Sequence, residues 1–119
     1  MSLDVRAVLR RAPISPFKVR RILNVIRGKG AVEALHILRF MPHRGARMVE
    51  KLLKSAIANA EENFGMHRDD LYIYRIYADE GPRYKRYRFG ARGRVKPYRR
   101  RTSHITIILR ERGWEEGEE

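Results

Sequence analysis

Apolar residues recur with a helical period through the first half of the chain. One face of a helix is marked at the i, i+3, i+4, i+7 spacing by Val19, Ile22, Leu23 and Ile26. Ser15 is a favourable N-cap, and Pro16 suits the first helical position, where no backbone N–H donor is needed. Gly28 and Gly30 tolerate the left-handed conformation of a helix C-terminus, so the helix is expected to end there.

Two further helices are predicted from the same period. Residues 31–40 form one of them, which Pro42 ends because proline cannot continue a helix. Its inward positions are expected to be Val32, Leu35 and Leu38. A longer helix is expected over about residues 43–63, closed by Gly65. Its core face is traced by Ala46, Val49, Leu53, Ala56, Ile57 and Ala60.

The period changes to two at three places, which predicts strands. A loose alternation over residues 4–10 predicts a short strand. Residues 71–78 and 102–109 are rich in aromatic and β-branched side chains, which favour strands. One face of the last strand would hold Ile105, Ile107 and Leu109.

The connection between the last two strands, about 20 residues long, has no core pattern. It is too long for an ordinary loop in a small domain, so it is either disordered alone or an extended β-ribbon. A ribbon with about ten residues per limb would reach roughly 30 Å. Because an isolated ribbon is only marginally stable in water, we expect it to be mobile in the free protein and ordered against a partner.

The composition indicates the kind of partner. The chain has 119 residues and a formal net charge of +13, with a pI near 10.9. The length fits one domain over residues 1–119, and the basic excess predicts a polyanion, first nucleic acid and second an anionic membrane surface. No apolar run approaches the length of a membrane span, and no signal peptide is apparent. The absence of cysteine excludes disulfides, thiolate zinc sites and a cysteine nucleophile.

The charge is concentrated in one segment. Residues 81–104 hold ten basic and no acidic side chains, whereas residues 65–80 and 105–119 are net acidic. Aromatic residues are interleaved with these cations. Guanidinium groups grip phosphates and aromatic rings stack on unpaired bases, so the mixture favours RNA over a solvated loop or a non-specific polybasic arm. The candidate RNA-binding residues of this segment are Arg83, Lys85, Arg86, Arg88, Arg92, Arg94, Lys96, Arg99, Arg100 and Arg101.

A second basic cluster lies on the first predicted helix. Its members are Lys18, Arg20, Arg21, Arg27 and Lys29. A charged helix face is often only solvated, but the nearby arginines at positions 6, 10 and 11 favour a phosphate-binding surface.

Three tyrosines on the predicted strand 71–78 allow two interpretations. They could form a platform on which single-stranded RNA stacks. The favoured interpretation is that they cover the predicted helix 43–63. These residues are Tyr72, Tyr74 and Tyr77.

No arrangement of residues supports catalysis or a metal site. No two histidines have the i, i+4 spacing of zinc ligands with a carboxylate alongside, which leaves structural or RNA-contacting roles for His36, His43, His67 and His104. Adjacent acids at 69–70 and 79–80 would point to opposite faces of a strand, which disfavours a shared Mg²⁺ site. No nucleophile with a matching base is visible. We therefore expect no enzyme activity, no metal and no cofactor.

Four stretches, in order and at the right spacing, resemble the bacterial type of large-subunit ribosomal protein number twenty-two. The similarity covers about residues 7–109 and leaves the acidic tail, about 113–119, outside it. The stretches are SPFKVR at 15–20 with IRGK at 26–29, SAIANAE at 55–61, DEGP at 79–82 with KR at 85–86, and ARGR at 91–94 with RTSHIT at 101–106. The last stretch adds His104 to the candidate RNA-binding residues. Gly90 and Phe89 depart from the residues usual in the family just before ARGR.

The resemblance implies an α+β fold, with three helices packed on a small three-stranded antiparallel sheet and a long protruding β-hairpin at about residues 80–102. It also implies a structural constituent of the large ribosomal subunit in the cytoplasm. Such a protein binds large-subunit ribosomal RNA, supports early assembly, and contacts neighbouring ribosomal proteins and the nascent peptide. No membrane partner is implied.

The hairpin of this family lines the nascent-peptide exit tunnel. The resemblance therefore places at the tunnel wall the tip residues Arg88, Phe89, Gly90, Ala91, Arg92, Gly93 and Arg94.

Two other classes stay open on the residues alone. A basic DNA-binding or architectural protein would share the charge, but no helix has the base-contacting polar residues that read a groove. An RNA-processing enzyme would need a convergent acid–base set, which we do not find.

Overall fold

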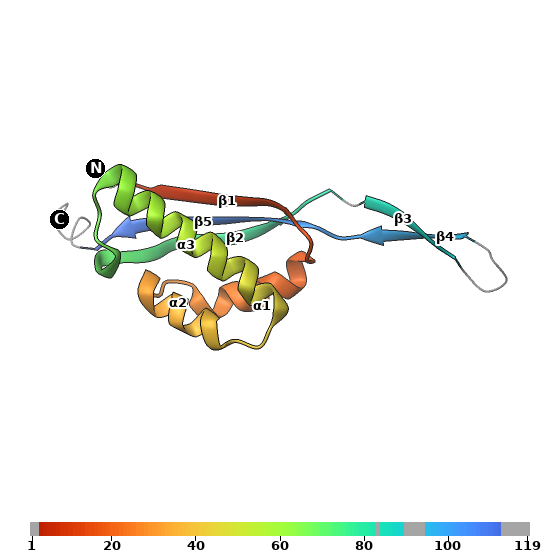
Figure 1. Ribbon diagram of the computed structural model, residues 1–119, viewed down its shortest axis with the longest axis horizontal. Coiled ribbons are helices and arrows are strands. Elements are labelled where there is room, and N and C mark those ends of the chain that lie inside the picture. The colour runs from red at the N-terminus through yellow and green to blue at the C-terminus, as the bar shows by residue number, and fades with distance from the viewer. Residues whose placement is uncertain (1–2, 83, 90–94, 113–119) are drawn as a thin grey trace.

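The computed structural model describes residues 3–82, 84–89 and 95–112, with side chains over 3–82 and 101–112. The described residues form three helices on one face of a three-stranded sheet, and a separate two-stranded ladder that extends away from them (Figure 1). This α+β architecture confirms the expected fold class. The elements are β1 Val5–Ala12, α1 Pro16–Ile26, α2 Ala31–Phe40, α3 Arg44–Phe64, the short 3₁₀ turn Arg68–Asp70, β2 Leu71–Glu80, β3 Tyr84–Phe89, β4 Val95–Arg100 and β5 Ser103–Glu111.

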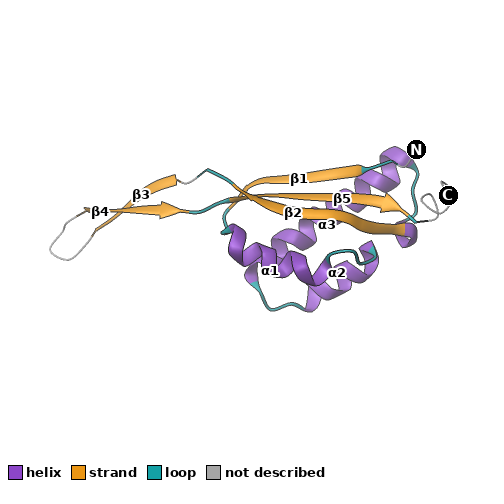
Figure 2. Cartoon of the chain, turned by 180° about the vertical axis from the view of Figure 1, so that it is seen from behind, coloured by secondary structure: helices purple, strands orange, loops and turns teal. Residues whose placement is uncertain are grey.

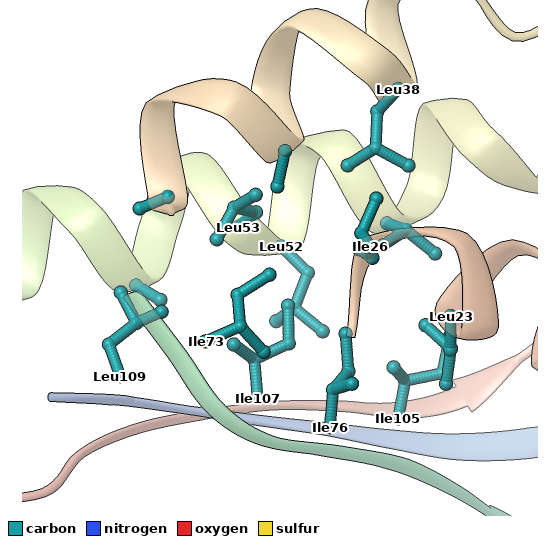
Figure 3. Packing of buried hydrophobic residues seen from close by; sticks show 14 of the residues in the cluster. Leu23, Ile26, Leu38, Leu52, Leu53, Ile73, Ile76, Ile105, Ile107 and Leu109 are labelled. Atoms are coloured by element: carbon teal, nitrogen blue, oxygen red, sulfur yellow. The ribbon is translucent and has the colours of Figure 1, made fainter. Parts of the chain in front are cut away.

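The sheet has the order β1-β5-β2, and both pairings are antiparallel. The central strand β5 alternates, so that Ile105, Ile107 and Leu109 are fully buried. These three positions lie opposite an apolar row on β2 and another on β1. Leucines and isoleucines from all three helices cover this face of the sheet and close one hydrophobic core (Figure 3).

The helix boundaries follow from local chemistry, as predicted. The Ser15 hydroxyl accepts a hydrogen bond from the Lys18 N–H at 3.4 Å, and proline begins α1. Gly65 closes α3 in the left-handed conformation, with φ of 62°.

The buried face of α2 differs from the prediction. It consists of Ala31, Ala34 and Leu38, whereas Val32 and Leu35 are only half-buried. The alanines and Leu38 form the side of α2 that faces the core, so Val32 and Leu35 lie at its margin.

The prediction that the three tyrosines of β2 cover α3 is wrong. A bulge between Ile73 and Arg75 interrupts the alternation of β2, and the buried side chains of the strand all face the helices. Tyr72 and Tyr74 alternate with buried residues of the same strand, so they lie on the opposite face of the sheet, where their ring centroids are 6.4 Å apart. The Arg110 guanidinium carbon lies 3.4 Å from the centre of the Tyr74 ring.

The ladder extends two neighbouring strands of the sheet into a hairpin, because β3 follows the edge strand β2 and β4 leads into the central strand β5 (Figure 2). β3 and β4 pair in register from Tyr84 opposite Arg100 to Phe89 opposite Val95. The molecule measures 67 × 28 × 24 Å, so the ladder gives it a long axis more than twice either of the others. We call residues 83–100 the arm. Residue 83 and the tip at 90–94 lie outside the described residues.

The arm joins the domain at a tightly packed neck. The Gly81 N–H donates to the Thr102 carbonyl at 2.9 Å, and the Thr102 hydroxyl donates to the Pro82 carbonyl at 2.6 Å. A Cβ atom on Gly81 would lie 2.5 Å from the Thr102 hydroxyl oxygen. Glycine is thus required where the two strands leave the sheet together.

Candidate nucleic-acid interface

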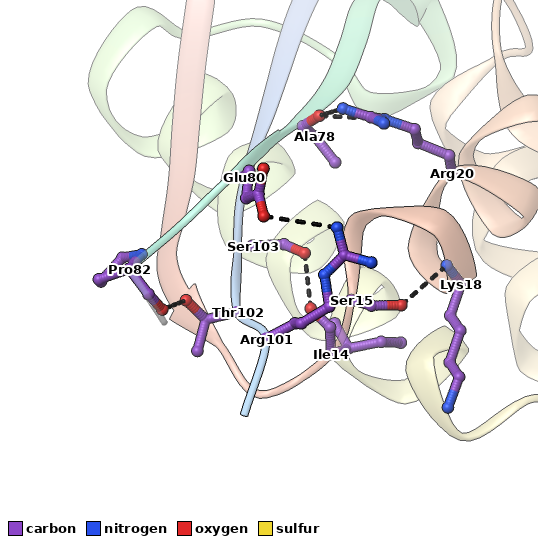
Figure 4. Close-up of polar contacts among 10 residues, drawn as sticks. All are labelled: Ile14, Ser15, Lys18, Arg20, Ala78, Glu80, Pro82, Arg101, Thr102 and Ser103. Atoms are coloured by element: carbon purple, nitrogen blue, oxygen red, sulfur yellow. Dashed lines mark hydrogen bonds and ion pairs between the residues drawn. The ribbon is translucent and has the colours of Figure 1, made fainter. Parts of the chain in front are cut away.

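The basic cluster predicted on α1 divides into two groups. Arg20 and Arg27 point toward β2, which is an edge strand of the sheet. Arg20 donates from Nη2 and Nε to the Ala78 carbonyl at 2.7 and 3.2 Å (Figure 4). Arg27 donates from Nη2 to the Ile76 carbonyl at 2.8 Å. These two guanidinium groups satisfy backbone acceptors of the sheet edge, so they have a role in the fold.

The same edge is closed further along by the backbone after α1. The Lys29 carbonyl accepts a hydrogen bond from the Ile73 N–H at 2.9 Å, and Gly30 forms an isolated bridge with Tyr72. The Lys29 side chain stays exposed. The segment that follows α1 therefore pairs with part of the open edge of β2, and this pairing fixes the position of the Lys29 backbone.

Lys18 and Arg21 belong to the second group and line a groove of about 770 Å³. Arg44 and His43 enter the same groove from the start of α3, and Arg101 enters it from the base of the arm. We call these five side chains the groove cations. Ile14, Ser15, Ile22 and Met48 are among the other residues that line it.

The groove unites two surfaces that the sequence suggested separately, one on the first helix and one on the arm. None of the described residues that line the groove is acidic. Arg44 was not predicted as an RNA-binding residue, and for His43 a structural and an RNA-contacting role were both left open. The available signal was two adjacent basic residues at the start of a helix, where the positive end of the helix dipole disfavours cations.

The base of the arm is tied to this groove. The Ser103 hydroxyl, fully buried, donates to the Ile14 carbonyl at 2.6 Å. One guanidinium nitrogen of Arg101 lies 3.4 Å from a Glu80 carboxylate oxygen, and both side chains are more than two-fifths exposed. Figure 4 shows these contacts around the point where the chain passes from the arm into β5. The groove and the neck therefore form one unit.

His104 has a structural contact in addition to its predicted role. Its Nδ1 accepts a hydrogen bond from the Arg11 N–H at 3.0 Å. Arg11 has a left-handed φ of 57°, within an irregularity of β1 between Leu9 and Ala12. The imidazole thus stabilises a strained backbone position, and Nε2 is the ring nitrogen left for another partner.

The arm residues are placed by their backbone register. Lys85 lies opposite Arg99 in the ladder, and Arg88 lies opposite Lys96. Like charges at directly opposed positions destabilise a β-pair, so this ladder is electrostatically unfavourable without a counter-charge. Arg86 and Arg100 occupy further positions of the same two strands. Of the other candidates, Arg83, Arg92 and Arg94 lie outside the described residues.

The described residues show no group of three or more histidine or acidic side chains that could hold a metal ion. In the same part of the chain, no helix has the length and apolar character to cross a membrane. One pair has shifted pKa values, and it lies away from the groove. A hydrogen bond from Arg68 lowers the pKa of Glu61, and the same bond raises the pKa of Arg68.

The sequence is similar to one known protein family and to several named proteins. The family model described as "Ribosomal protein L22p/L17e" matches residues 7–110. Three similar proteins each bear the name "Large ribosomal subunit protein uL22". The one from Caldicellulosiruptor saccharolyticus is 60% identical over 106 residues, which cover 89% of this chain and 87% of that protein. The protein from Thermoanaerobacter sp. (strain X514) is 56% identical over 110 residues, covering 92% and 99%. The protein from Thermomicrobium roseum is 52% identical over 109 residues, covering 92% of each.

A match over most of the chain, with the predicted motifs inside it, excludes a chance similarity. The helices, the sheet and the paired arm all fall within the matched range. The chain therefore belongs to the ribosomal protein L22p/L17e family, and it is a structural constituent of the large subunit of a bacterial-type cytoplasmic ribosome, not an enzyme.

Proposed function

We propose that this chain binds large-subunit ribosomal RNA, supports early assembly of the subunit, and lines the nascent-peptide exit tunnel with the tip of its arm. One observation supports the RNA contact above all others. The arm is a paired ladder outside the core, in a segment with ten basic and no acidic residues. Such an element gains stability only where a polyanion offsets its self-repulsion.

The opposed cations in the ladder favour RNA over a protein surface. Each phosphate along an RNA backbone supplies one negative charge, so RNA strands on either side of the narrow arm can neutralise the cations on both of its sides. Aromatic residues alternate with the cations and suit stacking on unpaired bases. The RNA-binding residues that we propose on the arm and its base are Arg83, Lys85, Arg86, Arg88, Arg92, Arg94, Lys96, Arg99, Arg100 and Arg101.

The domain supplies a second proposed RNA surface. The side chains of Lys18, Arg21 and Lys29 are exposed, and within the described part of the chain none of them donates to a backbone carbonyl as Arg20 and Arg27 do. Arg20 and Arg27 keep an RNA contact only through the donors that β2 does not use. His104 would contact RNA through Nε2.

The proposal for the tunnel depends on the length of the arm and on the family. A ladder at the end of a 67 Å axis carries Arg88 and Phe89 away from the core, and we propose that the tip, whose residues 90–94 lie outside the described ones, reaches a wall inside the particle. The partners there would be neighbouring ribosomal proteins and the nascent peptide.

The test is binding of the full chain to large-subunit ribosomal RNA over a range of salt concentrations. The double variant Arg92→Glu and Arg94→Glu should weaken binding and reduce the salt slope by about two to four, since each phosphate contact contributes about 0.9 to it. The matched control reverses two exposed charges on the helices, Arg39→Glu and Lys51→Glu. An unchanged slope in the arm variant would remove these residues from the phosphate contacts.

Competition separates RNA from DNA. Excess duplex DNA at matched salt should displace little of the bound ribosomal RNA, because the chain lacks a helix suited to the major groove. Equal competition by duplex DNA would instead indicate a general nucleic-acid-binding protein.

A further inference from the structure

We infer that the groove between the starts of α1 and α3 is a phosphate-binding site, which holds the backbone of an RNA segment at the joint between the domain and the arm. This inference rests on the proposed function and adds to it a specific site. Its residues are the groove cations: Lys18, Arg21, His43, Arg44 and Arg101.

The groove is shaped by close packing of the two helices. Gly45 lies in the first turn of α3 and is buried. A Cβ atom there would lie 2.5 Å from Ile14 Cδ1 and 2.9 Å from Ile22 Cδ1. Glycine thus brings the start of α3 against the loop before α1 and against α1 itself. The volume of about 770 Å³ falls in the ordinary range of ligand sites.

Among the described residues, an ion pair with Glu80 reaches Arg101, and none is found for Lys18, Arg21 or Arg44. The described lining of the groove has no carboxylate, and the first turns of α1 and α3 contain no acidic residue. Lys18 and Arg44 lie in those first turns, where the positive end of the helix dipole makes a cation unfavourable. Five basic side chains around one hollow therefore cost folding stability, and a bound anion is the physical reason for keeping them together.

Arg101 couples this site to the arm. Among the described residues, its side chain contacts the protein through the exposed ion pair with Glu80 at 3.4 Å, a kind of pair that contributes little to stability. The guanidinium can exchange that carboxylate for a phosphate without loss of fold. Because Arg101 directly follows β4, an RNA strand held in the groove continues along the base of the arm.

A polynucleotide fits this site better than an acidic protein segment. Phosphates recur at a fixed spacing along one strand, so one strand can meet cations that come from three separate elements. A protein partner would place its carboxylates on particular side chains, and binding would depend less on salt.

The decisive experiment uses the full chain with Arg21→Gln and Arg44→Gln together. The matched control, Arg39→Gln and Lys51→Gln, removes two exposed charges elsewhere on the helices. We expect the salt slope for large-subunit ribosomal RNA to fall by about one to two in the groove variant and to stay at the wild-type value in the control. Equal slopes in the two variants, or lost affinity without a lower slope, would overturn the inference.

A second readout does not depend on ribosomal RNA. Inorganic phosphate is titrated into the free protein, and backbone amide shifts are followed by NMR. Saturable shifts should concentrate at Lys18, Arg44 and Gly45 and disappear in the groove variant. If wild-type protein failed to bind the RNA, the proposed function would fail, and this titration alone would decide the site. Shifts spread evenly over all basic surfaces would then reject it.

Discussion

The domain and the arm are both rich in arginine, but they use it differently. In the domain, arginines donate to backbone carbonyls. Arg20 and Arg27 close the edge of β2, and Arg47 bonds the carbonyls of Leu38, Arg39 and Met41 at the end of α2. In the arm, the register sets cation opposite cation. Charge alone therefore does not identify a nucleic-acid contact, because the acceptors that the protein itself offers decide which cations are left for a partner.

The largest expected difference between the two regions is in amide hydrogen exchange of the free protein. The amides of Ile105, Ile107 and Leu109 in β5 should exchange only through global unfolding, because they lie in the core. The amides of β3 and β4 pair in a two-stranded ladder and should exchange more than about a thousandfold faster.

Addition of large-subunit ribosomal RNA should slow exchange in β3 and β4 and leave β5 unchanged. Strong protection across 84–89 and 95–100 in the free protein would show that the ladder is stable alone. The comparison between domain and arm would then lose its physical basis.

One added methyl group at the neck tests whether the junction between the domain and the arm needs glycine. Gly81→Ala puts a Cβ atom 2.5 Å from the Thr102 hydroxyl oxygen and 3.3 Å from the Thr102 carbonyl carbon. We expect the free energy of unfolding to fall by about 1–3 kcal/mol, measured by urea denaturation, because the Thr102 hydroxyl is buried and held by its hydrogen bond to the Pro82 carbonyl, so it cannot move aside freely.

Gly30→Ala is the matched control, since its Cβ atom would meet only ordinary contacts at 3.6 Å and beyond, with φ of −60°. The same loss of stability in both variants would mean that the neck imposes no special constraint.

A smaller effect should separate two neighbouring arginines of α1. Arg20→Ala removes two hydrogen bonds to the Ala78 carbonyl and should lower the free energy of unfolding by about 1 kcal/mol. Arg21→Ala should change stability by less than about 0.5 kcal/mol and lower the salt slope of RNA binding instead. Chemical denaturation and salt titration of both variants test this exchange of roles. If Arg20→Ala altered only RNA binding, the contact between Arg20 and β2 would contribute nothing to the stability of the fold.

These arginines also show how far sequence reasoning reaches. The helices and strands were predictable because apolar spacing, Ser15, Pro16 and Gly65 are local signals that tertiary packing did not override. The different roles of Arg20 and Arg21 were not predictable, because they depend on which side of α1 packs against the edge of a strand almost sixty residues away. Only the order β1-β5-β2 makes β2 an edge with open carbonyls.

The groove and the tyrosines were missed for the same kind of reason. Arg44 and Arg101 are far apart in the sequence, and they meet only because Gly45 allows α3 to approach α1 closely. The bulge between Ile73 and Arg75 shifts the alternation of β2, so that Ile76 and Ala78 face the helices and Tyr77 is exposed, and no local residue pattern predicts this shift. What sequence predicts well here is the elements and the total charge. What it does not predict is the set of long-range contacts that decide which basic side chains bond to the protein backbone and which stay exposed for a partner.

The smallest expected effect concerns an arginine that the domain uses at its surface. Arg68 donates to both carboxylate oxygens of Glu61, at 2.9 and 3.1 Å, and so lowers the pKa of Glu61 below its ordinary value of 4.5. A carboxyl whose pKa is lower in the folded than in the unfolded state adds stability above the unfolded pKa, and that stability is lost as pH falls through the folded pKa. Thermal unfolding should therefore find wild type slightly more stable than Glu61→Gln at pH 7, with the difference vanishing below the folded pKa. Because the pair is exposed, added salt should shrink the difference as well. A difference that persisted at acidic pH would mean that Arg68 acts on the fold through packing and not through its charge.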